Sequence, residues 1–300
     1  MTTSALSSDI GGGAAGRGRN RFGEFRNTRV YWLFLVPGAL LLVLLYLLPV
    51  GQVLWLSVTE PKFGFDNYVQ MVENPAVQRV VWATLRICVT TTAITVVLGY
   101  AVAYVLVHVN EHTRRLLMLA VLVPFWLSLL ARAFAWVTLL RGNGVVNTAL
   151  MNWGIIGQPL ELMRNEFGVM VGMIHYMLPY AILPLLANLD GIDRRLISAA
   201  RGLGASPTVA FLKIFLPLSV PGIAGAATLV FVFALGFYVT PAILGGGKTL
   251  MLAEMIKVNI IDTVRWALAA TLSSSLLIVI LLTLGIMTRL VGAKRLFGTP

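Results

Sequence analysis

Two arginines, Arg86 and Arg132, interrupt long apolar stretches of this 300-residue sequence. In a membrane-spanning helix a charged side chain is costly to bury, and it usually faces the protein interior or a solute pathway. Arg86 lies near one end of its stretch, where a long side chain can reach the membrane surface. Arg132 is eight residues from the end of its stretch, which is about 12 Å at 1.5 Å per residue. Two roles stay open for Arg132: lining a pathway, or hydrogen bonding to a neighbouring helix.

Aromatic and hydroxyl side chains near Arg132 and at the end of a later apolar stretch complete a candidate pathway. Aromatic faces bind organic cations through cation–π contacts, whereas an arginine favours an anionic or zwitterionic solute. These two signals point to different substrates. The residues predicted to line the pathway are Arg132, Trp136, Phe237, Tyr238 and Thr240.

Other reactive motifs are absent from the sequence or wrongly spaced. The stretch "LGGGKTL" at 244–250 lacks the four-residue spacer between the glycines of a nucleotide-binding loop, so we expect a turn there. His108, His112 and His175 do not have the spacing of a metal site, and no hydrolase nucleophile motif is present. We therefore expect no catalytic residue, metal site or cofactor in this chain.

The composition indicates a membrane protein. Hydrophobic residues make up 58% of the chain and charged residues 12%, against about 25% charged residues in a typical soluble domain, and the mean hydropathy is +0.86. In lipid, every backbone polar group must be satisfied within its own segment, which favours helices. The net charge of +11 does not indicate nucleic-acid binding, because no soluble domain remains to carry a basic face. The single cysteine, Cys88, excludes an intrachain disulfide bond.

Six segments reach the roughly 20 apolar residues that a spanning helix needs. The predicted fold class is an all-α integral membrane protein with six transmembrane helices. Residues 29–300 form one transmembrane domain, and residues 1–28 form a disordered basic tail. The predicted spans are 31–58, 80–109, 116–140, 167–189, 217–240 and 266–290. The loops 141–166 and 241–265 contain apolar stretches typical of short helices at the outer surface.

The basic residues predict the orientation in the membrane. With the N-terminus in the cytoplasm, 14 of the 23 Lys and Arg residues lie inside and 7 lie outside, and the remaining two are Arg86 and Arg132. Lys and Arg are enriched in cytoplasmic loops. We therefore predict that both termini are cytoplasmic.

Residues 190–216, between the fourth and fifth predicted spans, have the pattern of a helix, a sharp turn and a second helix. Asp193 can cap the first helix, and Gly204 has the position of a left-handed residue that ends it. Ser206-Pro207 is a start signal for the second helix, which we expect to end near Phe215. An apolar stripe on the first helix consists of Leu196, Ala199, Ala200 and Leu203. Either the protein's own helix ends or a separate partner would cover this stripe.

The stretch "SAARGLGASPTVAFLKIFLPLSVPGI" resembles the cytoplasmic signature of binding-protein-dependent ABC importer permeases. That signature has Glu-Ala-Ala, a later glycine and an Ile-x-Leu-Pro ending. Ser198 stands where the signature has glutamate, which removes any ion pair that the glutamate would make. "GFDNYVQMV", "RAFAWVTLLRGNGVVNTAL" and "GFYVTPAILGGGKTLMLAEMI" resemble the spermidine/putrescine-type permeases, from about Phe65 to Leu290. The residues that match the signature are Ala199, Ala200, Gly204, Ile214, Leu216 and Pro217.

The resemblance implies a subunit that forms half of a translocation pathway in a bacterial inner membrane, for a small polar solute such as a polyamine or a related amine or amino-acid-like compound. Its partners would be a second homologous permease, two ATP-binding subunits that hold ATP and Mg, and a periplasmic substrate-binding protein. Residues 190–216 would contain the cytoplasmic coupling helix, seated in an ATPase subunit. The residues implied in this contact are Leu196, Ser198, Ala199, Ala200, Arg201, Leu203, Gly204 and Ala205.

Glu161 and Glu254, in the two long outer loops, are predicted to contact the binding protein. Arg132 keeps open an anionic or zwitterionic solute, such as an opine or a phosphonate. A protein of a different class, a stand-alone secondary transporter, would need buried acids for ion coupling. No Asp or Glu lies well inside a predicted span, which disfavours that class.

Overall fold

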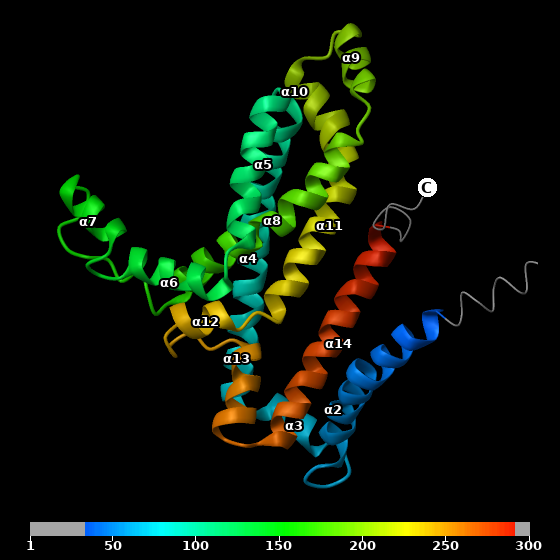
Figure 1. Cartoon of the computed structure of the whole chain (residues 1–300), viewed down its shortest axis with the longest axis vertical. Helices are drawn as coiled ribbons and strands as arrows, with labels where there is room; N and C mark the ends of the chain where they lie inside the picture. Colours follow the sequence, from blue (N-terminus) through cyan, green and yellow to red (C-terminus); the bar gives the residue numbers. More distant parts are fainter. Residues whose placement is uncertain (1–33, 292–300) are drawn as a thin grey trace, which may run out of the picture. The chain divides into compact units, whose positions relative to one another are not determined.

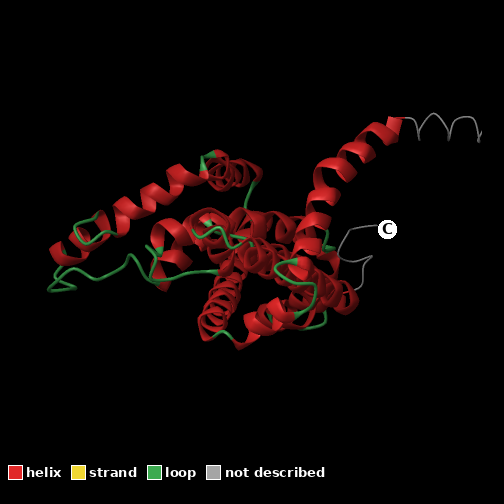
Figure 2. Ribbon diagram, turned by 90° about the horizontal axis from the view of Figure 1, so that it is seen from below, coloured by secondary structure: helices red, strands yellow, loops and turns green. Residues whose placement is uncertain are grey.

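The computed structural model describes residues 34–291, and every regular element in this part of the chain is a helix. Figure 2 shows these helices and the loops between them. The chain divides into two compact units, with the boundary between Gln52 and Val53. The predicted tail, 1–28, lies outside the described residues.

The described chain begins with the helix Phe34–Thr59, which contains a π-helical turn at Val43–Leu47 and continues as α2, Leu48–Thr59. The later elements are labelled in Figure 1 where space allows. They are α3 Asp66–Glu73, α4 Pro75–His108, α5 Glu111–Trp126, α6 Leu129–Leu140, α7 Val145–Asn152, α8 Glu166–Asp190, α9 Arg194–Gly202, α10 Pro207–Ala210, the π-helical segment η2 Phe211–Phe215, α11 Leu216–Leu235, α12 Val239–Leu244, α13 Leu252–Lys257, the π-helical segment η3 Val258–Asp262, and α14 Trp266–Val291.

Five helices among residues 34–291 are long and apolar enough to cross a membrane. They are Phe34–Thr59, Pro75–His108, Glu166–Asp190, Pro207–Leu235 and Trp266–Arg289. The number rises to six if α5 and the bent segment after it form one broken span. The all-α membrane fold predicted from the sequence is therefore confirmed, and α4, α8 and α14 overlie the second, fourth and sixth predicted spans.

The third predicted span, 116–140, is wrong as a single helix. α5 ends at Trp126, Leu127 and Ser128 are extended, and α6 begins at Leu129. The segment from Leu129 to Asn152 makes an angle of 100° with α5. Pro124 weakens the last turn of α5, because proline has no backbone N–H to donate. As Figure 1 shows, α6 leads away from the end of α5 toward α7.

The fifth predicted span, 217–240, is corrected at both ends. α11 stops at Leu235, because Gly236 and Phe237 leave the helix before α12 begins. At its start, no break separates the second cassette helix from the span, since Pro207–Leu235 is one continuous helix. The π-helical turn of η2 precedes Pro217 and allows the helix to continue through a residue that cannot donate a hydrogen bond.

The main core lies where α4, α8 and α11 pack together. Met173 and Ile182 of α8 are among its fully buried side chains. α4 approaches α8 closely at Gly99, where a Cβ atom would lie 2.9 Å from the Cβ of Ala181. This three-helix core holds in place both the cassette at one end and the Arg132 region toward the other.

Candidate functional site

The cassette, residues 190–216, starts each of its helices with the predicted caps. The Asp193 carboxylate accepts a hydrogen bond from the Arg195 N–H at the start of α9, and the Ser206 hydroxyl accepts one from the Val209 N–H at the start of α10. Gly204 lies between the two helices with a φ of +90°, a conformation that residues with a Cβ rarely adopt. The turn between α9 and α10 therefore depends on glycine.

Polar contacts connect the cassette to the ends of the spans. Arg194 donates a hydrogen bond to the carbonyl of Val107 in the last turn of α4. Arg114 of α5 forms an ion pair with Asp190, the last residue of α8. Ser198, which occupies the position of the glutamate in the signature, donates a hydrogen bond of 3.3 Å to the Arg194 carbonyl within α9. A glutamate at this position would carry a negative charge instead. These contacts place α9 directly beyond the ends of α4 and α8.

The apolar stripe on α9 remains largely uncovered by the described chain. Leu203 is 91% exposed and Leu196 is 48% exposed, whereas Ile197 packs against the core. The protein's own helix ends therefore do not cover the stripe among residues 34–291. The other residues predicted for ATPase docking are Ser198, Ala199, Arg201 and Gly204, which are exposed, and Ala200 and Ala205, which are half-buried.

Arg132 lies in the first turn of α6 and is buried, with 8% of the residue exposed. Its Cζ atom lies 4.4 Å from the ring centroid of Tyr176 on α8, a cation–π contact. Its Nε and Nη1 atoms have no hydrogen-bond partner among the described residues. The structural hydrogen bond considered from the sequence is therefore not formed by these atoms within residues 34–291.

A small cavity borders Arg132 between α6, α8 and α12. Trp136, His175, Tyr176 and Thr240 also line it, and its volume is about 10 Å³, enough for about one water molecule. Trp136 Nε1 donates a hydrogen bond of 3.1 Å to His175 Nδ1. Because an indole N–H is a donor only, Nδ1 is unprotonated and the neutral imidazole carries its hydrogen on Nε2. Among the residues that line the cavity, Arg132 and His175 therefore carry N–H groups that no described residue accepts.

The structure brings together four of the five predicted pathway residues. Arg132, Trp136 and Thr240 line the cavity, and Phe237 contacts Tyr176 with ring centroids 4.7 Å apart. Tyr238 is 44% exposed at the start of α12 and does not line the cavity. Sequence reasoning missed His175 and Tyr176. Their signal was available in "GMIHYMLPY", where polar rings interrupt an apolar span.

Five aromatic residues, which we call the aromatic ladder, form a series of ring contacts that begins at Tyr176 beside Arg132. Tyr176 and Tyr180 lie one turn apart on α8, with ring centroids separated by 5.8 Å. Phe233 of α11 packs on Tyr180 at 4.8 Å, and Phe125 of α5 does so at 5.3 Å. Phe237 completes the ladder through its contact with Tyr176. Phe233 is exposed and the other four rings are partly buried, while Arg132 already covers one face of Tyr176.

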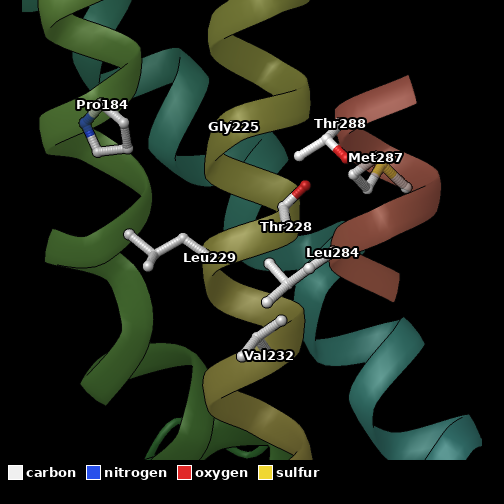
Figure 3. A pocket seen from close by; sticks show the side chains of 8 residues that line it. All are labelled: Pro184, Gly225, Thr228, Leu229, Val232, Leu284, Met287 and Thr288. Carbon is white, nitrogen blue, oxygen red and sulfur yellow. The ribbon is translucent and has the colours of Figure 1, made fainter. Parts of the chain in front are cut away.

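A larger groove lies between α8, α11 and α14 (Figure 3). Its volume is about 300 Å³, and its lining is mainly apolar. Its two hydroxyl groups are engaged within their own helices, since Thr228 donates to the Ala224 carbonyl and Thr288 donates to the Gly285 carbonyl. The groove is therefore poorly suited to a polar solute. The Arg132 cavity and the aromatic ladder form the better candidate site.

The two acids predicted to contact a binding protein differ in their surroundings. Glu161 is exposed in the loop after α7. Glu254 of α13 is only 8% exposed, and its Oε2 atom has no hydrogen-bond partner in the described part of the chain. Burial raises the pKa of the Glu254 carboxyl, while the Met251 backbone and Lys257 act in the opposite direction. The prediction for Glu254 is corrected, because a carboxylate packed inside the chain does not present its charge to a partner.

Two further sequence features have ordinary structural roles. The segment 244–250 is a turn, with φ values of +55° at Gly246 and +78° at Gly247. Arg86 forms an ion pair with Glu166 at the start of α8, and its side chain is 53% exposed. Neither feature contributes to the Arg132 cavity.

A family model described as "Binding-protein-dependent transport system inner membrane component" matches residues 95–295. This match extends from the middle of α4 through the cassette and α14, and it covers most of the chain. The chain belongs to this family. It is a multi-pass inner-membrane permease of a binding-protein-dependent ABC importer, the membrane component and not the ATPase. Members of this family act with an ATPase and a periplasmic binding protein.

The permease is similar in sequence to curated relatives with different solutes in their names. It is 32% identical to the spermidine/putrescine transport system permease protein PotB of Haemophilus influenzae over 72% of this chain and 76% of the relative. It is also 32% identical to PotB of Escherichia coli K12, over 74% of this chain and 81% of the relative. A probable sulfate transport system permease, cysT of Nephroselmis olivacea, is 28% identical over 74% of this chain and 75% of the relative.

Solved structures share the fold of this permease. A chain of the bacterial alginate ABC transporter, in complex with a periplasmic protein bound to an alginate pentasaccharide, matches with a TM-score of 0.75 at 18% identity. That match covers 92% of this chain and 99% of the other. A chain of the MetNI methionine ABC transporter, in an inward-facing conformation, matches with a TM-score of 0.56 at 20% identity over 72% of this chain and 94% of the other.

Proposed function

We propose that this permease forms half of the translocation pathway for a small amine, a polyamine or a related solute. The aromatic ladder is the observation that carries the proposal. Partly buried aromatic faces attract organic cations by about 0.5–2 kcal/mol each, and neighbouring rings on α8 and α11 offer such faces close to Arg132. The similarity to two PotB proteins supports an amine as the solute.

Uptake by the reconstituted importer tests this proposal. The complete complex, with its binding protein and ATPase subunits, should import radiolabelled putrescine or spermidine into liposomes in an ATP-dependent way. Tyr180→Ala should lower the uptake rate about tenfold, because one cation–π contact of up to about 2 kcal/mol is removed. Phe167→Ala is the matched control, since Phe167 is an exposed aromatic residue of α8 outside the ladder. If the wild-type complex imports neither of these amines nor an amine with a carboxylate such as 5-aminopentanoate, the proposal is wrong.

The exposed stripe of α9 is the surface that we assign to an ATPase subunit. Its support is the exposure of Leu203 and Leu196 next to a turn that depends on Gly204. Large exposed apolar side chains that gather at one place often mark an interface. Leu203→Glu should reduce co-purification of the ATPase subunit. Ile261→Glu, a change of an equally apolar exposed residue in η3, should leave it unaltered, and equal recovery with both variants would contradict the assignment.

The remaining partners complete the proposed assembly. A second homologous permease would form the other half of the pathway and could supply acidic lining, and two ATPase subunits would bind ATP and Mg. The periplasmic binding protein would contact the loop that carries Glu161. An anionic or zwitterionic solute is the second candidate, because Arg132 places a buried positive charge in the site and a relative is named for sulfate transport.

A further inference from the structure

The guanidinium of Arg132 is a buried charged group with unpartnered donors. The residue is 8% exposed, yet its Nε and Nη1 atoms have no hydrogen-bond partner among residues 34–291. A buried charge without hydrogen bonds is costly. Its guanidinium lies over the face of Tyr176, which attracts the charge but accepts no conventional hydrogen bond from these atoms. The donors of Arg132 are therefore available to an acceptor that is not part of the described chain.

The other groups around the Arg132 cavity also favour an acceptor with negative charge. His175 is held by Trp136 in the tautomer that carries a hydrogen on Nε2. Thr240 contributes a hydroxyl, and no residue that lines the cavity is Asp or Glu. A carboxylate satisfies such a set of donors well, because charge-assisted hydrogen bonds to arginine are the strong ones. A cationic amine alone would be repelled by Arg132 at this position.

We infer that Arg132 binds a carboxylate of the transported solute, and that this solute is an amine that also carries a carboxylate. The inference rests on the proposed function, since the ammonium group of the same solute would lie on the aromatic ladder. The two subsites adjoin each other, because Tyr176 contacts both Arg132 and the next ring of the ladder. A carboxylate that draws the guanidinium away from Tyr176 would free this ring face for the ammonium group.

The cavity must widen before a solute can enter. Its present volume of about 10 Å³ admits about one water molecule. Two of its walls, α6 and α12, are short helices that follow non-helical residues at 127–128 and 236–238. Gly172 allows α12 to lie against α8, since a Cβ atom there would be 2.6 Å from Thr240 Cγ2. Separation of α12 from α8 would open the site from the end opposite the cassette.

Ligand binding to the purified importer complex tests the inference without the binding protein's own selectivity. The probes are 5-aminopentanoate and putrescine. Both have an ammonium group on a chain of four CH2 groups, and the other end is a carboxylate in 5-aminopentanoate and a second ammonium group in putrescine. We expect 5-aminopentanoate to raise the melting temperature of the wild-type complex more than putrescine does. Arg132→Gln should weaken the apparent affinity for 5-aminopentanoate about 10- to 100-fold, the loss expected for a hydrogen bond to a charged group. Its response to putrescine should not weaken.

Two further variants keep the outcome interpretable. Arg132→Lys should retain part of the selectivity, because the positive charge remains. Arg86→Gln is the control, since Arg86 pairs with Glu166 outside the cavity, and it should respond like wild type. A response to putrescine alone, unchanged in Arg132→Gln, would overturn the inference while leaving the proposed function intact. If Arg132→Gln loses the second permease and Arg132→Lys restores it, Arg132 is a subunit contact and the inference is also wrong. A complex that responds to neither amine contradicts both.

Discussion

At the scale of single residues, two buried charges of opposite sign have different surroundings. Arg132 borders a cavity and stacks on an aromatic ring, whereas Glu254 is packed among its neighbours on α13 with one carboxylate oxygen unpartnered. The first arrangement leaves donors facing a space that a ligand can fill. The second arrangement buries a carboxylate at a cost in free energy and offers no evident ligand site. Removal of the Arg132 charge should therefore impair ligand binding, whereas removal of the Glu254 charge should stabilise the protein.

Glu254→Gln should stabilise the protein at neutral pH by roughly 1 kcal/mol, because the amide avoids the desolvation of the carboxylate. Burial raises the pKa of Glu254 in the folded protein. As the pH falls through this raised pKa, Glu254 takes up a proton in the folded wild type, and the cost of burying its negative charge decreases. The stability advantage of Glu254→Gln should therefore vanish below about pH 4.3, the ordinary pKa of glutamate. Thermal unfolding in detergent from about pH 7.5 to pH 4 measures the difference. An advantage that grows toward low pH would contradict this account.

At the scale of elements, the breaks between helices are decided by different kinds of residue. The end of α9 depends on Gly204 with its φ of +90°. The end of α5 follows Pro124, yet Pro179 and Pro184 lie inside α8 without breaking it. A positive φ is a local requirement of the backbone, whereas a proline in a long helix can be accommodated by its neighbours. The cassette turn is therefore the more exacting position for substitution.

Gly204→Val should weaken recovery of the ATPase subunit about tenfold, while the protein still inserts in the membrane at normal abundance. A Cβ at residue 204 meets no atom within 4 Å, so the cost is backbone strain of roughly 1–2 kcal/mol. Gly204→Ala should be milder, and Gly204→Asn milder still, because asparagine tolerates left-handed conformations. Quantitative co-purification and transport assays measure the series.

Gly202→Ala provides the control for this series. Gly202 also has open space around it, but its φ is not positive. Its variant should therefore assemble and transport like wild type. If all three substitutions at Gly204 match this control, the turn does not require glycine.

At the scale of the whole molecule, the orientation predicted from the basic residues can be tested with single cysteines. Cys88 is the only cysteine of the chain and is fully buried, so wild type should show little background labelling. In cells that lack the ATPase subunits, a membrane-impermeant maleimide should label Glu161→Cys while the cells are intact, and it should label Leu203→Cys only after the membrane is opened. The reason is that positive charge concentrates on the cytoplasmic side, where the cassette is expected. Labelling of Leu203→Cys in intact cells would show that the orientation is the opposite of the predicted one.

The sequence by itself determined the features that depend on neighbours along the chain. The apolar composition and the lengths of the spans indicated a helical membrane protein, and the caps and glycine of residues 193–207 located the starts of both cassette helices. These features can be predicted because they depend only on residues that are close in sequence: about 20 consecutive apolar residues make a span, and a cap involves residues within one helical turn. The same signals indicated that Arg132 is buried, since it lies in an apolar segment.

Only the tertiary structure decided how the distant elements combine. It separated α5 from α6, although prolines in α8 are tolerated. It buried Glu254, which the sequence places in a loop between spans. It also brought Arg132, His175 and Thr240 together from α6, α8 and α12. The physical reason is that helices pack through contacts between residues far apart in the sequence, such as Thr240 against Gly172. Such contacts leave no periodic pattern or fixed spacing in the sequence.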